Sequence, residues 1–204
     1  MRYIIMLLMG LWSSSLLAVM PAELLNERLL QLHTLTAKYI QTSYDPGPNG
    51  KKIVSGDVVM ERPNKFRWRI EKPYHQVLLS DAKKFYIYDE DLDQVVVKPL
   101  TNSVQDAPAL LLIGETGDVS KNFQVRQTSM GGFQEVFTLV PKDKESMIKS
   151  IDLTYRGSVL HSMRFKDTLD QVVNIEFTDL QQNGTLADNI FKLDIPKGVD
   201  VIEE

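Results

Sequence analysis

Residues 62–71 read Arg62-Pro63-Asn64-Lys65-Phe66-Arg67-Trp68-Arg69-Ile70-Glu71. From Phe66 onward apolar and charged residues alternate strictly, so Phe66, Trp68 and Ile70 point to one side of an extended chain. A period of two is typical of a strand with one buried face and one exposed face. The segment therefore predicts a β-protein whose buried face is rich in aromatic side chains.

Further segments around this stretch have the length and composition of strands, and turn signals separate them. The expected strands cover residues 38–44, 54–61, 76–80, 84–88, 94–98, 123–128, 135–140, 150–155, 160–166 and 172–179. The turn signals are the run 45–50 and the pairs 131–132, 156–157 and 183–184. Short strands joined by tight turns, without alternating helices, predict one antiparallel sheet, curled or closed, rather than a doubly wound fold.

Two segments favour helix. Residues 21–36 carry leucines at helical spacing behind Pro21, and Glu23 suits the first turn of a helix. The leucines of this expected apolar stripe are Leu24, Leu25, Leu29, Leu32 and Leu35. Residues 106–114 form a short, very apolar helical turn that ends at Gly114, in a place between strands where a polar loop would be usual.

The first 18 residues predict an export signal that is removed from the mature protein. Arg2 supplies the positive charge, an apolar run follows, and small residues lead to Ala18, after which we expect cleavage. Residues 19–204 are then expected to form a single domain, since this length fits one domain and no linker or repeat interrupts it. The chain has no cysteine, which excludes thiolate chemistry and a lipid anchor on a cysteine.

The charge balance argues against nucleic acid as a partner. The full chain has 23 Lys and Arg against 27 Asp and Glu, a net charge of −4, and loss of Arg2 with the signal makes this −5. A nucleic-acid binder usually has a basic balance and a basic patch. His33, His75 and His161 show no metal-binding spacing, and no nucleophile–base pair or phosphate loop is recognisable. We therefore expect no metal site, no cofactor and no enzymatic activity.

The aromatic stripe admits two interpretations. Phe66, Trp68 and Ile70 could form the ordinary core face of a strand. Alternatively they could line a cavity, because the aromatic residues are large and clustered, with Tyr86 and Tyr88 on a neighbouring strand, while little helical material is available to cover a long sheet. A curled sheet with a mobile apolar cover is one way to build a lipid cavity.

Several motifs together resemble the LolA family of periplasmic carriers of outer-membrane lipoproteins. They are Arg62-Pro63-Asn64-Lys65-Phe66-Arg67-Trp68, Ser80-Asp81-Ala82-Lys83-Lys84, Tyr86-Ile87-Tyr88, Gln41, Pro141-Lys142 and the C-terminal run from Phe191 to Val201. The resemblance covers nearly the whole chain after the export signal, and its most specific part is the R-P-N-x-F-x-W segment.

The resemblance implies an unclosed antiparallel β-barrel, or half-barrel, covered by a helical lid. It implies a periplasmic chaperone that takes triacylated lipoproteins from an inner-membrane ABC transporter and passes them to an outer-membrane lipoprotein acceptor. The acyl chains would lie in a cavity whose residues here are expected to be Phe66, Trp68, Ile70, Tyr86, Tyr88, Leu110 and Leu111. In this family the arginine of R-P-N bonds to carbonyl groups of the lid and holds it shut, which here implies a latch from Arg62 to Leu112 and Ile113.

One departure and some alternatives accompany this interpretation. The family's lid often has an aromatic residue after its proline, whereas Pro108 is followed by Ala109. A related lipid- or lipoprotein-binding module could instead act as the acceptor or as an envelope sensor. The acceptor is expected to carry a cysteine, and this chain has none; a sensor is expected to carry a second domain, for which 204 residues leave little room. A monomer is expected.

Overall fold

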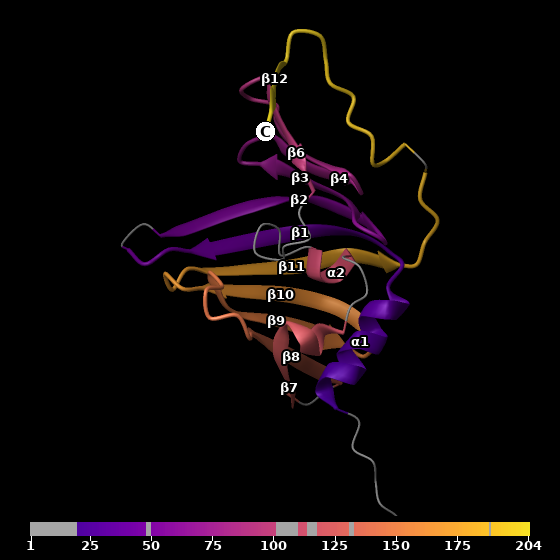
Figure 1. Ribbon diagram of the computed structural model, residues 1–204, viewed down its shortest axis with the longest axis vertical. Helices are drawn as coiled ribbons and strands as arrows, with labels where there is room; N and C mark the ends of the chain where they lie inside the picture. Colours follow the sequence, from indigo (N-terminus) through magenta and orange to yellow (C-terminus); the bar gives the residue numbers. More distant parts are fainter. Residues whose placement is uncertain (1–19, 48–49, 101–109, 114–117, 131–132, 188) are drawn as a thin grey trace, which may run out of the picture.

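A computed structural model of the chain describes residues 20–47, 50–100, 110–113, 118–130, 133–187 and 189–204. One twelve-stranded sheet contains every strand of these residues, in the order β12-β6-β5-β4-β3-β2-β1-β11-β10-β9-β8-β7. The terminal strands of this order, β12 and β7, do not pair with each other, so the curved sheet stays open (Figure 1). The expected unclosed, mainly β architecture is thereby confirmed.

The strands agree closely with those expected from the sequence, and most begin or end a few residues further out. Their bounds are β1 Thr34–Tyr44, β2 Lys51–Glu61, β3 Lys65–Lys72, β4 Gln76–Asp81, β5 Lys84–Asp89, β6 Gln94–Pro99, β7 Phe123–Ser129, β8 Gln134–Pro141, β9 Ile148–Arg156, β10 Val159–Asp167, β11 Val172–Gln182 and β12 Asp200–Glu203. The strand β12 was not expected, and it lies parallel to β6, whereas all the other pairs are antiparallel.

The first helix, α1, runs from Pro21 to Gln31 and is shorter than expected. Its start follows the sequence signals, because Glu23 accepts a hydrogen bond from the Met20 amide at 3.2 Å. The expectation that the helix extends to residue 36 is wrong, since Leu32 is already extended and β1 begins at Thr34. Leucines spaced for a helix continue here into a strand, where β-branched threonines favour the extended chain. Leu35 is fully buried as a strand residue.

Two shorter helical segments follow in the second half of the chain. The helix α2, Leu110–Ile113, lies in the expected apolar turn, and a 3₁₀ helix, η1, spans Val119–Lys121. The side chains of Leu110 and Ile113 lie outside the described part, as do Pro108, Ala109, Gly114 and the expected export signal at residues 1–18. No helix in the described ranges is long and apolar enough to span a bilayer.

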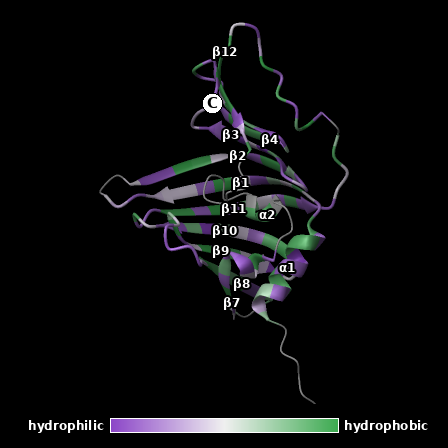
Figure 2. Cartoon of the chain, in the orientation of Figure 1, coloured by the Kyte–Doolittle hydropathy of each residue, from purple (hydrophilic) through white to green (hydrophobic). Residues whose placement is uncertain are grey.

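The main core covers one face of the sheet, here called the inner face. Its buried residues come from strands β1 to β3 and β7 to β11, and from both α-helices and η1. In Figure 1 α1 and α2 lie in front of the sheet, α1 over its lower strands and α2 near β1 and β11. Figure 2 shows why one face can be apolar, since hydrophobic and hydrophilic residues alternate along the strands.

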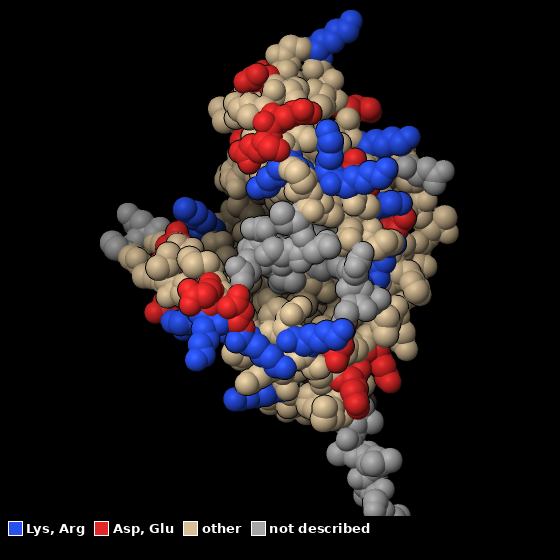
Figure 3. All heavy atoms as spheres, in the orientation of Figure 1, with Lys and Arg blue, Asp and Glu red and all other residues tan. Residues whose placement is uncertain are grey.

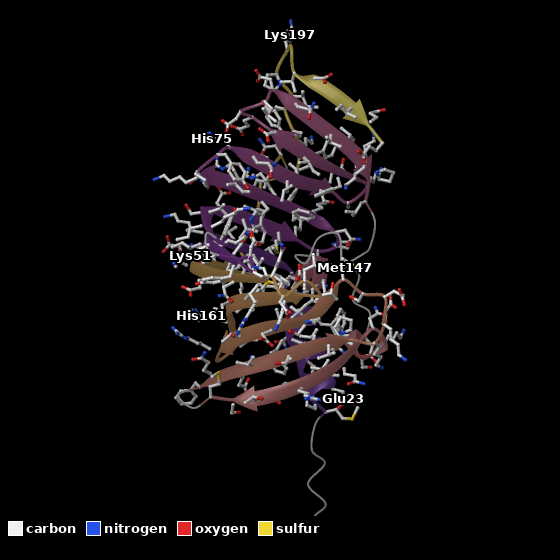
Figure 4. The ribbon with its side chains drawn as sticks, turned by 90° about the vertical axis from the view of Figure 1, so that its left-hand side faces the viewer. Glu23, Lys51, His75, Met147, His161 and Lys197 are labelled. Atoms are coloured by element: carbon white, nitrogen blue, oxygen red, sulfur yellow. The ribbon has the colours of Figure 1, made fainter. Side chains whose placement is uncertain are left out.

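A second, smaller apolar cluster lies on the opposite face of β4, β5 and β6, here called the outer face. Val77, Leu79, Tyr88, Val95 and Val97 form it. The C-terminal segment covers this cluster with Leu193 and Val199 before it adds β12 beside β6. In the view of Figure 4 the long axis of the molecule runs from Glu23 in α1 at one end to Lys197 before β12 at the other.

Candidate functional site

The register of the strands places the aromatic stripe of β3 on the inner face. Trp68 lies opposite Val58 of β2 and Leu78 of β4, and directly opposed residues of antiparallel strands share a face. Phe66 lies opposite Met60 in the same way. The three predicted residues of β3 are therefore brought together and buried, with exposed fractions of 1% for Phe66 and 7% for Trp68 and Ile70.

Aromatic contacts connect this stripe to distant strands. The ring centroids of Trp68 and Tyr39 of β1 lie 4.6 Å apart, and those of Trp68 and Phe177 of β11 lie 6.4 Å apart. Phe66 contacts Phe85 of β5 with centroids 5.7 Å apart. Aromatic side chains contribute large apolar areas, so these contacts join β1, β3, β5 and β11 in one aromatic group on the inner face.

A glycine opposite Tyr39 lets β2 and β3 approach closely beside this aromatic group. Gly56 pairs with Tyr39 across β1 and β2, and the ladder between β2 and β3 shifts register at Ser55 and Gly56. A β-carbon on Gly56 would lie 1.8 Å from the carbonyl oxygen of Arg69. The Tyr39 hydroxyl donates to that same oxygen at 3.3 Å, and burial raises the pKa of Tyr39.

The helix α2 contributes two leucines to the same cluster. Leu111 is 8% exposed and Leu112 is fully buried, and both belong to the apolar cluster that contains Trp68. Leu111 and Trp68 are therefore parts of one apolar cluster, and a role of Leu111 in binding acyl chains stays a prediction. The described side chains of α2, Leu111 and Leu112, thus contribute apolar packing to the inner face.

Tyr86 and Tyr88 do not share the face of Trp68, which corrects the grouping expected from the sequence. Tyr86 lies opposite Leu79 and Tyr88 opposite Val77, and both tyrosines pack with the outer cluster. The Tyr86 hydroxyl donates to Asp81 at 3.1 Å, and burial and this acceptor raise the pKa of Tyr86. A strand's side chains alternate between faces, so a difference of one residue in register moves all of them to the other side.

Three further residues of the inner face were not predicted from the sequence. Leu78 lies beside Trp68, Ile87 lies beside Leu78, and Phe85 lies beside Ser80. The segment Phe85-Tyr86-Ile87-Tyr88 alternates, which was a usable signal, but both of its faces are apolar. Only the pairing with β4 decides which pair of side chains faces Trp68.

The R-P-N motif forms the tight turn between β2 and β3. Asn64 has a φ of +61°, a left-handed conformation that asparagine tolerates better than most residues. The carbonyl oxygen of Asn64 accepts a hydrogen bond from the buried Ser80 hydroxyl at 2.6 Å. Ser80 begins the second motif, in which Asp81 accepts the amides of Lys83 and Lys84 at the β4–β5 turn. The two motifs are therefore neighbouring turns at the same end of strands β3 and β4.

Arg62 extends from this turn toward the end of α1. Its Nε donates to the carbonyl oxygen of Leu32 at 2.8 Å, and its backbone amide donates to the carbonyl oxygen of His33 at 2.9 Å. Two carboxylates close to Arg62 in the sequence pair with other residues: Asp57 with Arg67 and Arg69, and Glu61 with Lys65. Burial lowers the pKa of Arg62, which lies near the ring of Tyr155.

The described residues show no group of three or more acidic or histidine side chains that could hold a metal ion. His75 pairs with Asp91, whose oxygens accept from its backbone amide at 3.0 Å and lie 3.2 Å from its Nδ1. Figure 4 shows His75 and His161 far apart along the sheet. Acidic and basic side chains are interspersed on the face shown in Figure 3, where the described residues form no extended basic surface.

An open cavity of about 250 Å³ lies beside α1, at the ends of β7 and β8. Arg28 of α1 is one of its lining residues, and it donates to the Gly157 carbonyl at 2.6 Å and pairs with Glu135. The Arg28 guanidinium also stacks 4.8 Å from the ring centre of Tyr155. These contacts engage Arg28 in holding α1 against the sheet, so we assign the cavity no ligand.

Comparison with known proteins gives one consistent result. Residues 30–194 match the family described as Outer membrane lipoprotein carrier protein LolA. An outer-membrane lipoprotein carrier protein of Pseudomonas syringae pv. syringae (strain B728a) is 36% identical over 180 residues, which cover 88% of this chain and 86% of that protein. One from Chromohalobacter salexigens is 37% identical over 183 residues, covering 90% and 87%. One from Pseudomonas fluorescens (strain Pf-5) is 34% identical over the full length of both chains.

Solved structures resemble the chain in fold alone. An uncharacterized conserved protein from Thermus thermophilus superposes with a TM-score of 0.54 at 13% sequence identity, covering 87% of this chain and 94% of that one. A DUF1329 family protein from Desulfovibrio piger gives a TM-score of 0.50 at 10% identity, covering 84% and 94%.

Proposed function

The chain belongs to the LolA family of outer membrane lipoprotein carrier proteins, and from this premise we propose that it is a chaperone that carries lipoproteins through the cell envelope. The observation that supports this most directly is the continuous apolar inner face under the short helix α2. We propose that the acyl chains of the cargo lie on this face, against Phe66, Trp68, Ile70, Leu78 and Phe85.

The energetics of the cargo require such a face. Each buried CH₂ group is stabilised by about 0.8 kcal/mol, so three acyl chains in water would cost tens of kcal/mol. A carrier must therefore cover most of their length. The inner face offers aromatic and aliphatic side chains without a described metal or paired catalytic group, which suits binding rather than chemistry. We accordingly propose a carrier and not an enzyme.

Loading of acyl chains requires that part of the apolar cover of the inner face move aside. The side chains of Leu111 and Leu112 are buried in the same cluster as Trp68 in the structure. We propose that acyl chains displace α2 and replace its leucines, because apolar contacts are non-directional and one apolar group can substitute for another. On this proposal Leu110 and Leu111 face the cargo, and α2 is the part of the lid that moves.

Release requires that the cover return, and we propose that Arg62 serves this step as a latch. An arginine has five donors and stays charged, so a partly buried arginine needs several acceptors. Leu32 supplies one of them from the end of α1. The contact of Arg62 with the carbonyls of Leu112 and Ile113 remains part of the proposal. A few hydrogen bonds of this kind break and re-form easily, which suits a reversible cover.

The finer elements of the function are proposals as well. We propose that the protein works in the periplasm, takes triacylated lipoproteins from an inner-membrane ABC transporter and delivers them to an outer-membrane lipoprotein acceptor. The relatives are named carriers of outer-membrane lipoproteins, and a carrier of this kind needs a donor and an acceptor. No nucleotide-binding motif is recognisable in the sequence, so energy for loading would come from the donor.

The proposed function is tested by recovering the cargo. The tagged full-length chain is expressed in a diderm bacterium and purified from the periplasmic fraction without detergent, and the bound material is identified by mass spectrometry. Triacylated lipoproteins are expected in near-stoichiometric amount when their delivery to the outer membrane is blocked. Their absence, with the purified protein folded, would refute the carrier function.

The latch is tested by transfer of a radiolabelled lipoprotein from the purified carrier to outer membranes. Arg62→Leu should accept cargo but deliver much less of it, because a cover that does not reclose does not expel the acyl chains. Arg164→Leu is the matched control, since Arg164 is an exposed arginine on the outer face of β10. Normal delivery by Arg62→Leu would show that the latch is not needed.

A further inference from the structure

The junction between α1 and β1, residues 31–34, receives hydrogen bonds from a second side chain besides Arg62. Asn183, directly after β11, donates from Nδ2 to the carbonyl oxygen of Gln31 at 2.9 Å and accepts the His33 amide on Oδ1 at 2.8 Å. Its own amide donates to the carbonyl oxygen of Thr34 at 2.9 Å. Asn183 thus contacts the backbone of three junction residues.

The two side chains reach the junction from opposite sides of β1. β1 pairs with β2 on one side, and Arg62 follows the last residue of β2. It pairs with β11 on the other side, and Asn183 follows the last residue of β11. Figure 1 shows the end of β11 next to the start of β1 at the right-hand edge of the sheet. We name Arg62 and Asn183 together the junction clamp.

The hydrogen bonds of the clamp interleave along the chain. Asn183 binds the Gln31 carbonyl, Arg62 the Leu32 carbonyl, Arg62 again the His33 carbonyl, and Asn183 the Thr34 carbonyl. A helix end leaves carbonyl groups without intrahelical partners, so side chains that supply donors fix both its position and its direction. The Leu32 carbonyl therefore points at Arg62 only while Asn183 holds the residues on either side of it.

We propose that Asn183 is a positioning residue of the latch, which fixes the α1–β1 junction so that Arg62 meets the Leu32 carbonyl. This inference rests on the proposed carrier function for its effect on cargo, but not for its effect on the junction itself. It predicts that loss of the Asn183 side chain weakens the hold of Arg62 although Asn183 forms no described hydrogen bond with Arg62. Delivery of cargo should then fall while loading continues.

The conformation at Asn183 allows a clean substitution. Asn183 has a φ of +59°, which glycine adopts without strain, so Asn183→Gly preserves the turn and its backbone hydrogen bond and removes only the side chain. If Asn183 merely formed the turn, the glycine variant would behave as wild type. A second variant, Asn183→Asp, keeps the acceptor for the His33 amide but turns an oxygen toward the Gln31 carbonyl and puts negative charge at a helix C-terminus, which is unfavourable. Gln181→Ala, at an exposed neighbouring position, is the matched control.

The experiment combines amide hydrogen exchange with lipoprotein transfer on the full chain. In Asn183→Gly and Asn183→Asp the Arg62 amide, which is bonded to His33, should exchange about tenfold faster, and delivery should fall by a similar factor with loading retained. Gln181→Ala should match wild type in both. Unchanged exchange at Arg62, or faster exchange with normal delivery, would overturn the proposal. If the wild-type chain takes up no lipoprotein, the proposed function fails instead, and the exchange at Arg62 still decides whether Asn183 positions it.

Discussion

At the scale of single residues, close backbone approach at Gly56 sets the geometry of the aromatic centre. β2 and β3 shift register there, and the Arg69 carbonyl that occupies the space of a β-carbon also accepts the Tyr39 hydroxyl. Since the obstructing atom belongs to the backbone of a strand paired on both sides, it has little freedom to move. Tyr39 and Trp68 therefore depend on a residue that contributes no side chain of its own.

Gly56→Ala is expected to destabilise the protein by about 3 kcal/mol, because a methyl group overpacks a site that cannot relax. The free energy of unfolding from urea titration measures this directly. Gly184→Ala is the matched control, since a β-carbon there meets nothing within 4 Å, and its effect should stay within about 0.5 kcal/mol. Equal stability of the two variants would contradict the close approach at Gly56.

At the scale of elements, α1 is docked at its C-terminal end and at its middle. Arg62 and Asn183 hold its C-terminal end, and halfway along it Asn26 donates to Asp118 at 2.9 Å and accepts the Val119 amide at 3.0 Å. Asp118 is also the N-cap of η1, where it accepts the Ser120 hydroxyl and amide. These hydrogen bonds, from Ser120 first and then Asn26, lower the pKa of Asp118 to about 2.

The depressed pKa of Asp118 predicts a pH dependence with a definite sign. A carboxyl group whose pKa is lower in the folded chain stabilises the fold above its ordinary pKa of 3.8, and this contribution is lost as the pH falls through about 2. The difference in unfolding free energy between wild type and Asp118→Asn should therefore shrink from about pH 5 to about pH 2.5. Urea unfolding at the two pH values measures it, and a constant difference would contradict the role assigned to the Asp118 carboxylate.

The strand β12 protects an edge of the sheet. It pairs with β6, whose Val95 and Val97 belong to the outer cluster, and Lys84 of β5 lies 3.5 Å from Glu203. An exposed edge strand rich in valine is a template for pairing with another chain. Deletion of residues 200–204 should therefore cause concentration-dependent association, measured by sedimentation velocity. Lys84→Ala, which removes the ion pair and leaves β12, should sediment as the wild type does. A truncated chain that does not associate would contradict this role of β12.

The sequence predicted elements better than faces. Alternation along β3 correctly placed Phe66, Trp68 and Ile70 together, because every second residue there is charged and only one face can be buried. It misplaced Tyr86 and Tyr88, because both faces of β5 are apolar and only the pairing with β4 separates them. It also extended α1 to residue 36, since the leucine spacing fits a helix as well as the start of β1. Asn183 gave a turn signal, but its bonds to the α1–β1 junction connect residues far apart in sequence.

At the scale of the whole molecule, the open sheet has two apolar faces with different covers. The outer cluster is covered by the C-terminal segment, which continues into a strand of the sheet. The inner face is covered in part by α2, whose Leu111 and Leu112 pack in its apolar cluster. A cover built into the sheet is costly to remove, whereas a one-turn helix held by leucines is exchanged for other apolar groups at little cost. The inner face is accordingly the one that we assign to cargo.

The most direct test of this assignment compares two adjacent residues on opposite faces of β5. A photoreactive phenylalanine analogue is placed at Ile87, on the inner face, or at Tyr86, on the outer face, since both side chains are half-buried and differ mainly in direction. Each carrier is loaded with a radiolabelled triacylated lipoprotein and irradiated. We expect the lipoprotein to crosslink to the carrier modified at position 87 and not to the carrier modified at position 86. Crosslinking only at position 86, or equally at both, would contradict the claim that the cargo lies on the inner face.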